Sequence, residues 1–81
     1  MDATRSTPYD EVYDFLLSAP SPEAVIAFHP SEQTQARVRY LLDANRNGVL
    51  SATEQAELDE FSSVEHFVRM LKIRAQKKLS A

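Results

Sequence analysis

The 81-residue chain contains no cysteine, and its uninterrupted apolar runs are only a few residues long. The absence of cysteine excludes stabilisation by disulfides. Because long apolar runs are missing, we expect no membrane-spanning segment, and the N-terminus does not resemble a signal peptide. These absences together predict a soluble, cytoplasmic protein.

Glycine and proline are also scarce over most of the chain. Glycine occurs once, at Gly48, and the four prolines all lie in the first 30 residues. No stretch alternates Val, Ile or Thr with polar residues over the length of a strand. The sequence therefore predicts an all-α protein with short N-terminal helices followed by an antiparallel hairpin with a long C-terminal helix.

The size of the chain predicts one helical domain over residues 1–81. Apolar residues make up 43% and charged residues 26%, which is typical of a folded protein. A chain of this length buries only roughly 60–65% of its unfolded surface, so its stability is thin. Without disulfides, the usual remaining supports are a metal, an oligomer or a partner.

Charge is separated along the last third of the chain. Residues 54–65 contain five acids and no base, whereas residues 66–81 contain five bases and no acid. A helix dipole favours this order, acidic first and basic last, without any partner. A polyanion or an acidic protein surface is the alternative explanation.

Helix start signals divide the chain into four segments. Thr7-Pro8 and Ser21-Pro22 are each typical of an N-cap followed by the first helical residue. They predict an N-terminal helix within residues 1–20, ending near Ala19 and only loosely packed, and a short helix over 23–28. Ser31 predicts a third helix to about residue 45, the first arm of a hairpin over 31–79.

The last segment begins with Ser51 and Glu54, a capping box, and contains no Gly or Pro to its end. A second Ser-x-x-Glu at 62–65 allows a break, but we favour one continuous helix. An apolar stripe follows one side of it at helical spacing: Phe61, Val64, Phe67, Val68, Leu71, Ala75 and Leu79.

This last helix is longer than the helix expected to cover it, about 42 Å against about 21 Å. Met70 and Ile73 lie off the main stripe, and a small domain would struggle to bury both sides. Exposed apolar faces usually mark an interface, so we expect a homodimer, a protein partner or both. The predicted partner-binding residues are Phe61, Val64, Phe67, Val68, Met70, Leu71 and Ile73, with Arg69, Lys72 and Arg74 as a charged rim.

The segment "DANRNGVLSATE" matches the pattern of an EF-hand calcium loop. In that interpretation Asp43, Asn45, Asn47, Val49 and Glu54 supply the metal-binding oxygens. A simple helix-to-helix bend explains much of the same segment, because Asn47 and Gly48 suit left-handed positions and Ser51 and Glu54 form a cap. The loop has little charge and no second loop to pair with, so calcium stays the alternative interpretation.

Signals for enzyme chemistry are absent from the sequence. There is no glycine-rich phosphate loop and no Gly-x-Ser-x-Gly, and neither His29 nor His66 has a companion at metal-binding spacing. We expect a non-enzymatic protein with no catalytic residues and no required cofactor. Direct DNA binding is a further alternative, since basic residues occur in the third and fourth segments, but the last helix begins with acids.

The stretches "PEAVIAF", "LLDANRNG", "AELDEF" and "EHFVRMLKIRA" resemble a set of small uncharacterised all-helical bacterial proteins. The resemblance covers residues 20–76. Proteins of this set are often encoded beside an HNH-type nuclease gene. The resemblance therefore implies an antitoxin-like role, in which the protein neutralises a nuclease partner.

Overall fold

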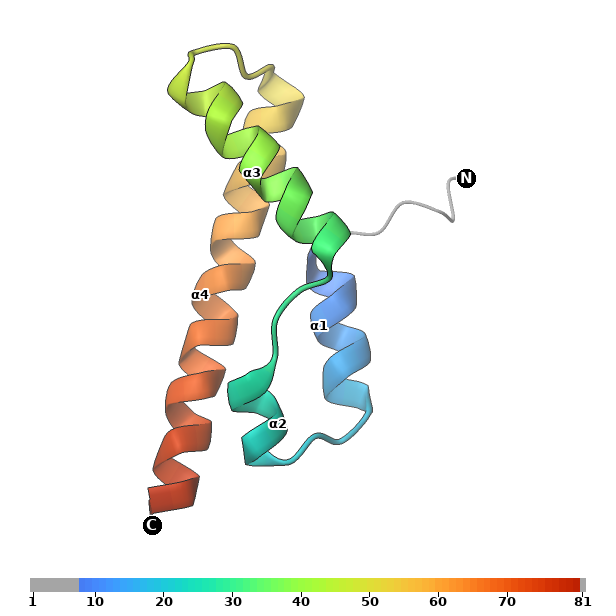
Figure 1. The fold of residues 1–81 in the computed structure, drawn as a ribbon, viewed down its shortest axis with the longest axis vertical. Helices are drawn as coiled ribbons and strands as arrows, with labels where there is room; N and C mark the ends of the chain where they lie inside the picture. The colour runs from blue at the N-terminus through green and yellow to red at the C-terminus, as the bar shows by residue number, and fades with distance from the viewer. Residues whose placement is uncertain (1–7, 81) are drawn as a thin grey trace.

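The computed structural model describes residues 8–80, which form four α-helices and contain no strand (Figure 1). The helices are α1 (Pro8–Leu17), α2 (Pro22–Ala27), α3 (Glu32–Arg46) and α4 (Ala52–Ser80). The predicted all-α class with a long C-terminal helix is confirmed. The predicted cap Thr7 lies outside the described residues.

The predicted start signals work as local caps. Ser21 and Ser31 accept hydrogen bonds from the backbone N–H groups three residues later, at 3.1 and 3.2 Å. Ser51 and Glu54 form the reciprocal capping box, with both bonds at 3.1 Å. The second Ser-x-x-Glu does not interrupt α4, which is continuous over 29 residues.

The helix ends differ from the predictions in two places. α1 ends at Leu17, two residues early, and Ala19 takes a left-handed φ of 55° before Pro20. In the bend between α3 and α4 only Gly48 is left-handed, with φ 71°. The expectation that Asn47 is also left-handed is wrong. Asn47 is the C-cap of α3 and has a right-handed backbone conformation, with φ −86°.

The long helix α4 is the spine against which the other three helices pack. α3 contacts α4, and so do the two N-terminal helices α1 and α2. In Figure 1, α3 lies over the beginning of α4, and α1 and α2 lie beside its second half. The early helices therefore cover part of the length that α3, with 15 residues, cannot reach.

The core is small and is concentrated on one side of α4. Among the described residues, the buried apolar side chains are Val12, Leu41, Ala44, Leu58 and Ala75. Most of the predicted stripe is half-buried on this side. Phe67, Met70 and Ile73, by contrast, are 39%, 40% and 40% exposed. The expected apolar surface outside the core is therefore present.

Candidate functional site

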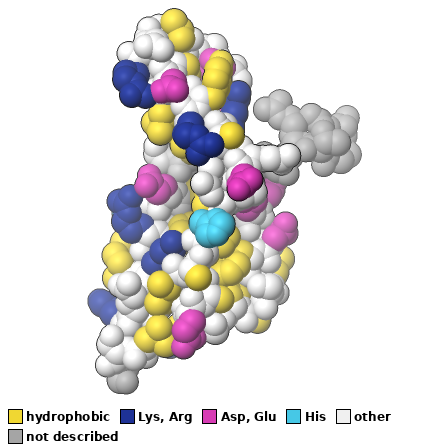
Figure 2. Space-filling view, in the orientation of Figure 1, with side chains coloured by type: hydrophobic (Ala, Val, Ile, Leu, Met, Phe, Trp, Pro, Cys, Tyr) yellow, Lys and Arg dark blue, Asp and Glu magenta, His cyan; other side chains and the backbone are white. Residues whose placement is uncertain are grey.

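An apolar groove of about 470 Å³ runs along one flank of α4. Figure 2 shows hydrophobic side chains on this face between the charged side chains over α4 and those over the N-terminal helices. The apolar walls come from four parts of the chain: Val12, Phe28, Pro30, Val38, Leu42, Leu58, Phe61, Val64 and Val68.

Each wall of the groove is held by a different element. Phe61, Val64 and Val68 project from α4 at helical spacing and form one wall. Leu42 comes from α3 and is 48% exposed, so its side chain faces the open space of the groove. Phe28 follows α2 and forms part of the opposite wall. The centroid of its ring lies 4.5 Å from the ring centroid of Phe15 in α1, so this wall packs on α1.

The charged groups on the α4 side of the groove differ in their partners. Arg69 donates to the Glu65 carboxylate at 2.9 Å, one helical turn earlier. Lys72 is half-buried in the groove wall and forms no ion pair within residues 8–80. The lining also contains the Glu11 carboxylate, so the four charged side chains Glu11, Glu65, Arg69 and Lys72 sum to zero, and Lys72 provides a positive charge only locally beside the apolar wall.

Glu11 joins α1 to the start of α3 at the edge of the groove. Its carboxylate accepts from the Ser31 backbone N–H at 2.9 Å, from the Ser31 hydroxyl at 3.0 Å and from the Thr34 hydroxyl. Partial burial raises the pKa of Glu11, but the bonds from Thr34 and Ser31 together outweigh it and hold the pKa below its usual value. The ionised carboxylate thus positions α1 as a wall of the groove.

The connection between α2 and α3 is fixed by one carbonyl. The Pro30 carbonyl accepts from the Gln35 side-chain amide at 2.7 Å and lies 3.1 Å from His29 Nδ1. Because a carbonyl only accepts, Nδ1 carries the proton in this contact. His29 and Gln35 both line the groove, so this arrangement shapes its polar edge.

The structure brings only some of the predicted partner-binding residues to the groove. Phe61, Val64 and Val68 line the groove, together with the predicted rim residues Arg69 and Lys72. The remaining members do not line it. Leu71 is half-buried away from it, and three apolar residues and one rim residue are exposed elsewhere on α4: Phe67, Met70, Ile73 and Arg74.

Sequence reasoning missed the groove residues outside α4. Phe28 and Leu42 belong to distant segments, and only packing on α4 brings them together. Leu42 follows the fully buried Leu41 and is 48% exposed, a difference that no pattern in the sequence marks. No sequence signal marks Glu11 either, because its hydrogen-bond partners Ser31 and Thr34 lie 20 and 23 residues away along the chain.

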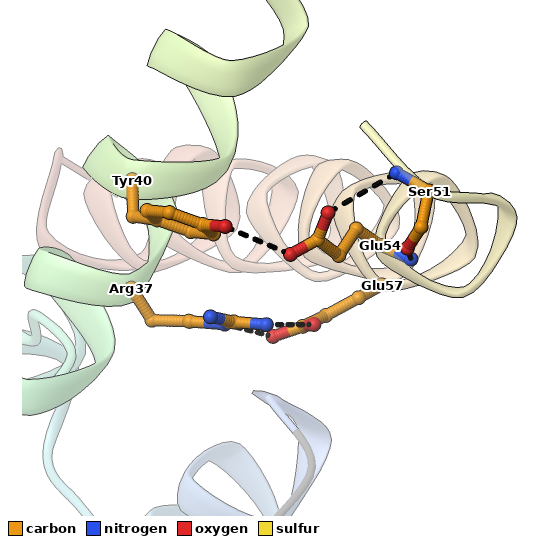
Figure 3. Close-up of polar contacts among 5 residues, drawn as sticks. All are labelled: Arg37, Tyr40, Ser51, Glu54 and Glu57. Carbon is orange, nitrogen blue, oxygen red and sulfur yellow. Dashed lines mark hydrogen bonds and ion pairs between the residues drawn. The ribbon is translucent and has the colours of Figure 1, made fainter. Parts of the chain in front are cut away.

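A polar cluster joins α3 to the start of α4 (Figure 3). We name it the clasp, and it consists of Arg37, Tyr40, Ser51, Glu54 and Glu57. Arg37 donates two bonds of 2.8 Å to the Glu57 carboxylate, and its guanidinium lies 4.9 Å from the centre of the Tyr40 ring. The Tyr40 hydroxyl donates to Glu54 at 3.0 Å. The bond to Glu57 raises the pKa of Arg37, and the bond to Glu54 raises the pKa of Tyr40.

The clasp also engages the glutamate proposed for calcium. Both Glu54 carboxylate oxygens accept hydrogen bonds, one from the Ser51 backbone N–H and one from the Tyr40 hydroxyl. The Ser51 bond is the main reason that the pKa of Glu54 is lowered, followed by the Tyr40 bond. Glu54 therefore acts here as a helix cap.

The other oxygens of the predicted calcium loop do not converge in this structure. Asp43 and Asn45 lie in the last turn of α3, so their side chains leave the helix about 200° apart. Asp43 pairs with Arg46, and Asn47 and Val49 form the bend itself. Within residues 8–80 there is also no group of three or more His, Asp or Glu side chains that could hold a metal. Calcium binding remains an untested prediction.

Comparisons with models of known protein families, with curated proteins and with solved structures find no match to the chain. The resemblance to antitoxin-like bacterial proteins, and the nuclease partner that it implies, therefore stay predictions. No helix within residues 8–80 is both long enough and apolar enough to cross a membrane.

Proposed function

We propose that the protein is a non-enzymatic interaction module that binds an amphipathic helix of a protein partner in the groove beside α4. The observation that carries the proposal is the groove itself, with apolar walls from α1, α3, α4 and the segment after α2. Its volume of about 470 Å³ lies within the range of ligand sites and accommodates a few apolar side chains. Helix-in-groove binding uses such anchors at helical spacing.

The position of Lys72 suggests where a charged residue of the partner helix would lie. Lys72 stands half-buried beside the apolar wall that Val64 and Val68 form. A partner helix with an acidic residue one turn from its apolar anchors would place a carboxylate near this ammonium group. The sequence resemblance makes a nuclease-like protein encoded by the adjacent gene the first partner to test, in the antitoxin-like role.

Binding would also stabilise the module. Few side chains are buried within residues 8–80, so the free protein has little core. A partner that binds only the folded state raises the free energy of unfolding by mass action. A second copy of the chain is the other expected partner, and the exposed residues of α4 outside the groove are the surface left for it.

The test compares Leu42→Glu with Val49→Glu, because both side chains are exposed and only Leu42 lines the groove. Each variant is co-expressed with the product of the adjacent gene and purified through a tag on the module. We expect Leu42→Glu to reduce co-purification at least about tenfold and Val49→Glu to leave it unchanged. Equal recovery with both variants would exclude the groove as the binding site.

A second measurement does not depend on the partner's identity. Anilinonaphthalene sulfonate combines an apolar ring system with one anionic group, so it can contact the apolar wall and the Lys72 ammonium group together. We expect its fluorescence on binding to fall with Leu42→Glu and with Lys72→Glu, and to persist with Val49→Glu. Circular dichroism checks that all variants keep their helix content, since the dye also binds partly unfolded proteins.

A further inference from the structure

The side of α4 turned away from the groove carries a regular row of exposed residues. Each residue of an α-helix advances by about 100°, so positions spaced alternately by four and three residues stay on one side. On α4 such a row, which we name the outer face, consists of Asp59, Ser63, His66, Met70, Ile73 and Lys77. All six residues are exposed.

We propose that two copies of the chain associate through their outer faces, with the two α4 helices antiparallel about a two-fold axis. The alternating spacing is that of a helix pair packing side by side. Met70 and Ile73, each 40% exposed, provide the apolar centre. The surface is separate from the groove, since no outer-face residue lines the groove.

Charge selects the antiparallel orientation. Asp59 lies near the acidic end of the outer face and Lys77 at its basic end. In a parallel pair Asp59 would lie beside Asp59 of the second chain and Lys77 beside Lys77, and both contacts would be between like charges. In an antiparallel pair Asp59 of each copy lies opposite Lys77 of the other, and the two helix dipoles also oppose each other.

The same register matches the rest of the outer face. When Asp59 lies opposite Lys77, Ser63 lies opposite Ile73 and His66 lies opposite Met70. Each apolar side chain then meets a small or flat side chain from the other copy, so the helices can approach closely. The two-fold axis repeats every contact, which gives two ion pairs about 27 Å apart at the ends of the contact.

The expected dimer is weak. One helix face of this length buries roughly a few hundred Å² per copy, which is below the area of a standard stable interface. We therefore expect dissociation in the micromolar range or above. Sedimentation equilibrium of the full chain from about 10 to about 500 μM covers this range.

Charge exchange tests the register directly. Asp59→Lys places lysine opposite Lys77, and Lys77→Asp places aspartate opposite Asp59; we expect each change to weaken dimerisation at least about tenfold. The double variant exchanges the two charges and should restore dimerisation to within about threefold of the original. Lys78→Asp is the matched control, because it makes the same charge change in the same helical turn, about 100° away.

Three results would overturn the proposal: a monomer at the highest concentration, a dimer unaffected by both single exchanges, or a double variant that does not recover. Equal weakening by Lys78→Asp and Lys77→Asp would overturn it as well. Failure here is distinguishable from failure of the proposed function. Capture of a partner depends on Leu42 in the groove, whereas dimerisation depends on the outer face.

Discussion

The two halves of α4 are stabilised in different ways. The first half packs against α3, where Leu41, Ala44 and Leu58 are buried and the clasp of Figure 3 joins the two helices. The second half packs against α1 and α2, and none of the six residues of α2 is buried. The large apolar side chains of α4 that are exposed all lie in the second half, at Phe67, Met70, Ile73 and Leu79, whereas the groove spans the middle of the helix from Leu58 to Lys72.

Both proposed binding surfaces lie on the same long helix that holds part of the core. On α4 the mean directions of the groove residues and of the outer face lie about 130° apart around the helix axis. The two proposals are therefore compatible, because a partner helix in the groove and a second copy on the outer face would form a complex of two modules with two partners.

The largest effect is expected from the core beside α3. Leu41 is fully buried, so Leu41→Ala should lower the free energy of unfolding by about 3 kcal/mol. A domain of this size has about 3–5 kcal/mol in total, and the milder Leu41→Val keeps the loss measurable at about 1 kcal/mol. Urea unfolding followed by circular dichroism gives both values. Leu17→Ala, at a side chain that is 84% exposed, is the control and should change little.

If Leu41→Val cost no more than Leu17→Ala, the first half would not be the more stable one. The comparison between the halves would then be wrong, and the groove would not be the region with most to gain from a partner.

An intermediate effect is expected where α1 meets α3. Glu11→Gln replaces a carboxylate that accepts three hydrogen bonds, so we expect it to lower the free energy of unfolding by about 1 kcal/mol at neutral pH. Because the folded state lowers the pKa of Glu11, its contribution is present above the usual carboxyl pKa and is lost as the pH falls through the folded value. The difference between the two proteins should therefore shrink below about pH 4.

Asp14→Asn on the same helix is the matched control, since Asp14 is exposed. Urea unfolding at a series of pH values measures both variants. A Glu11→Gln difference that stayed constant into acid would contradict the role of the ionised carboxylate.

Local signals in the sequence account for the helices and for little of the site. Ser21, Ser31 and Ser51 mark helix starts because a cap and its N–H partner lie three residues apart. The stripe on α4 predicted an apolar face because residues on one side of a helix are also only three or four positions apart. Where Phe28 and Leu42 meet that face depends on packing between distant segments, which periodicity does not encode. For this reason only part of the predicted set of binding residues lines the groove in the structure.

The smallest effect concerns two turns, one between α3 and α4 at Gly48 and one between α1 and α2 at Ala19. Gly48 and Ala19 have similar left-handed φ values of 71° and 55°, but only one is glycine. An alanine there costs about 1–2 kcal/mol of strain, and a glycine costs about 0.4–1 kcal/mol through the entropy of the unfolded chain. Ala19→Gly should therefore raise the free energy of unfolding by about 0.5 kcal/mol. Gly48→Ala, where an added Cβ meets no atom within 4 Å, should lower it by a similar amount. Thermal and urea unfolding measure the pair, and equal signs would show that φ alone does not decide stability at these turns.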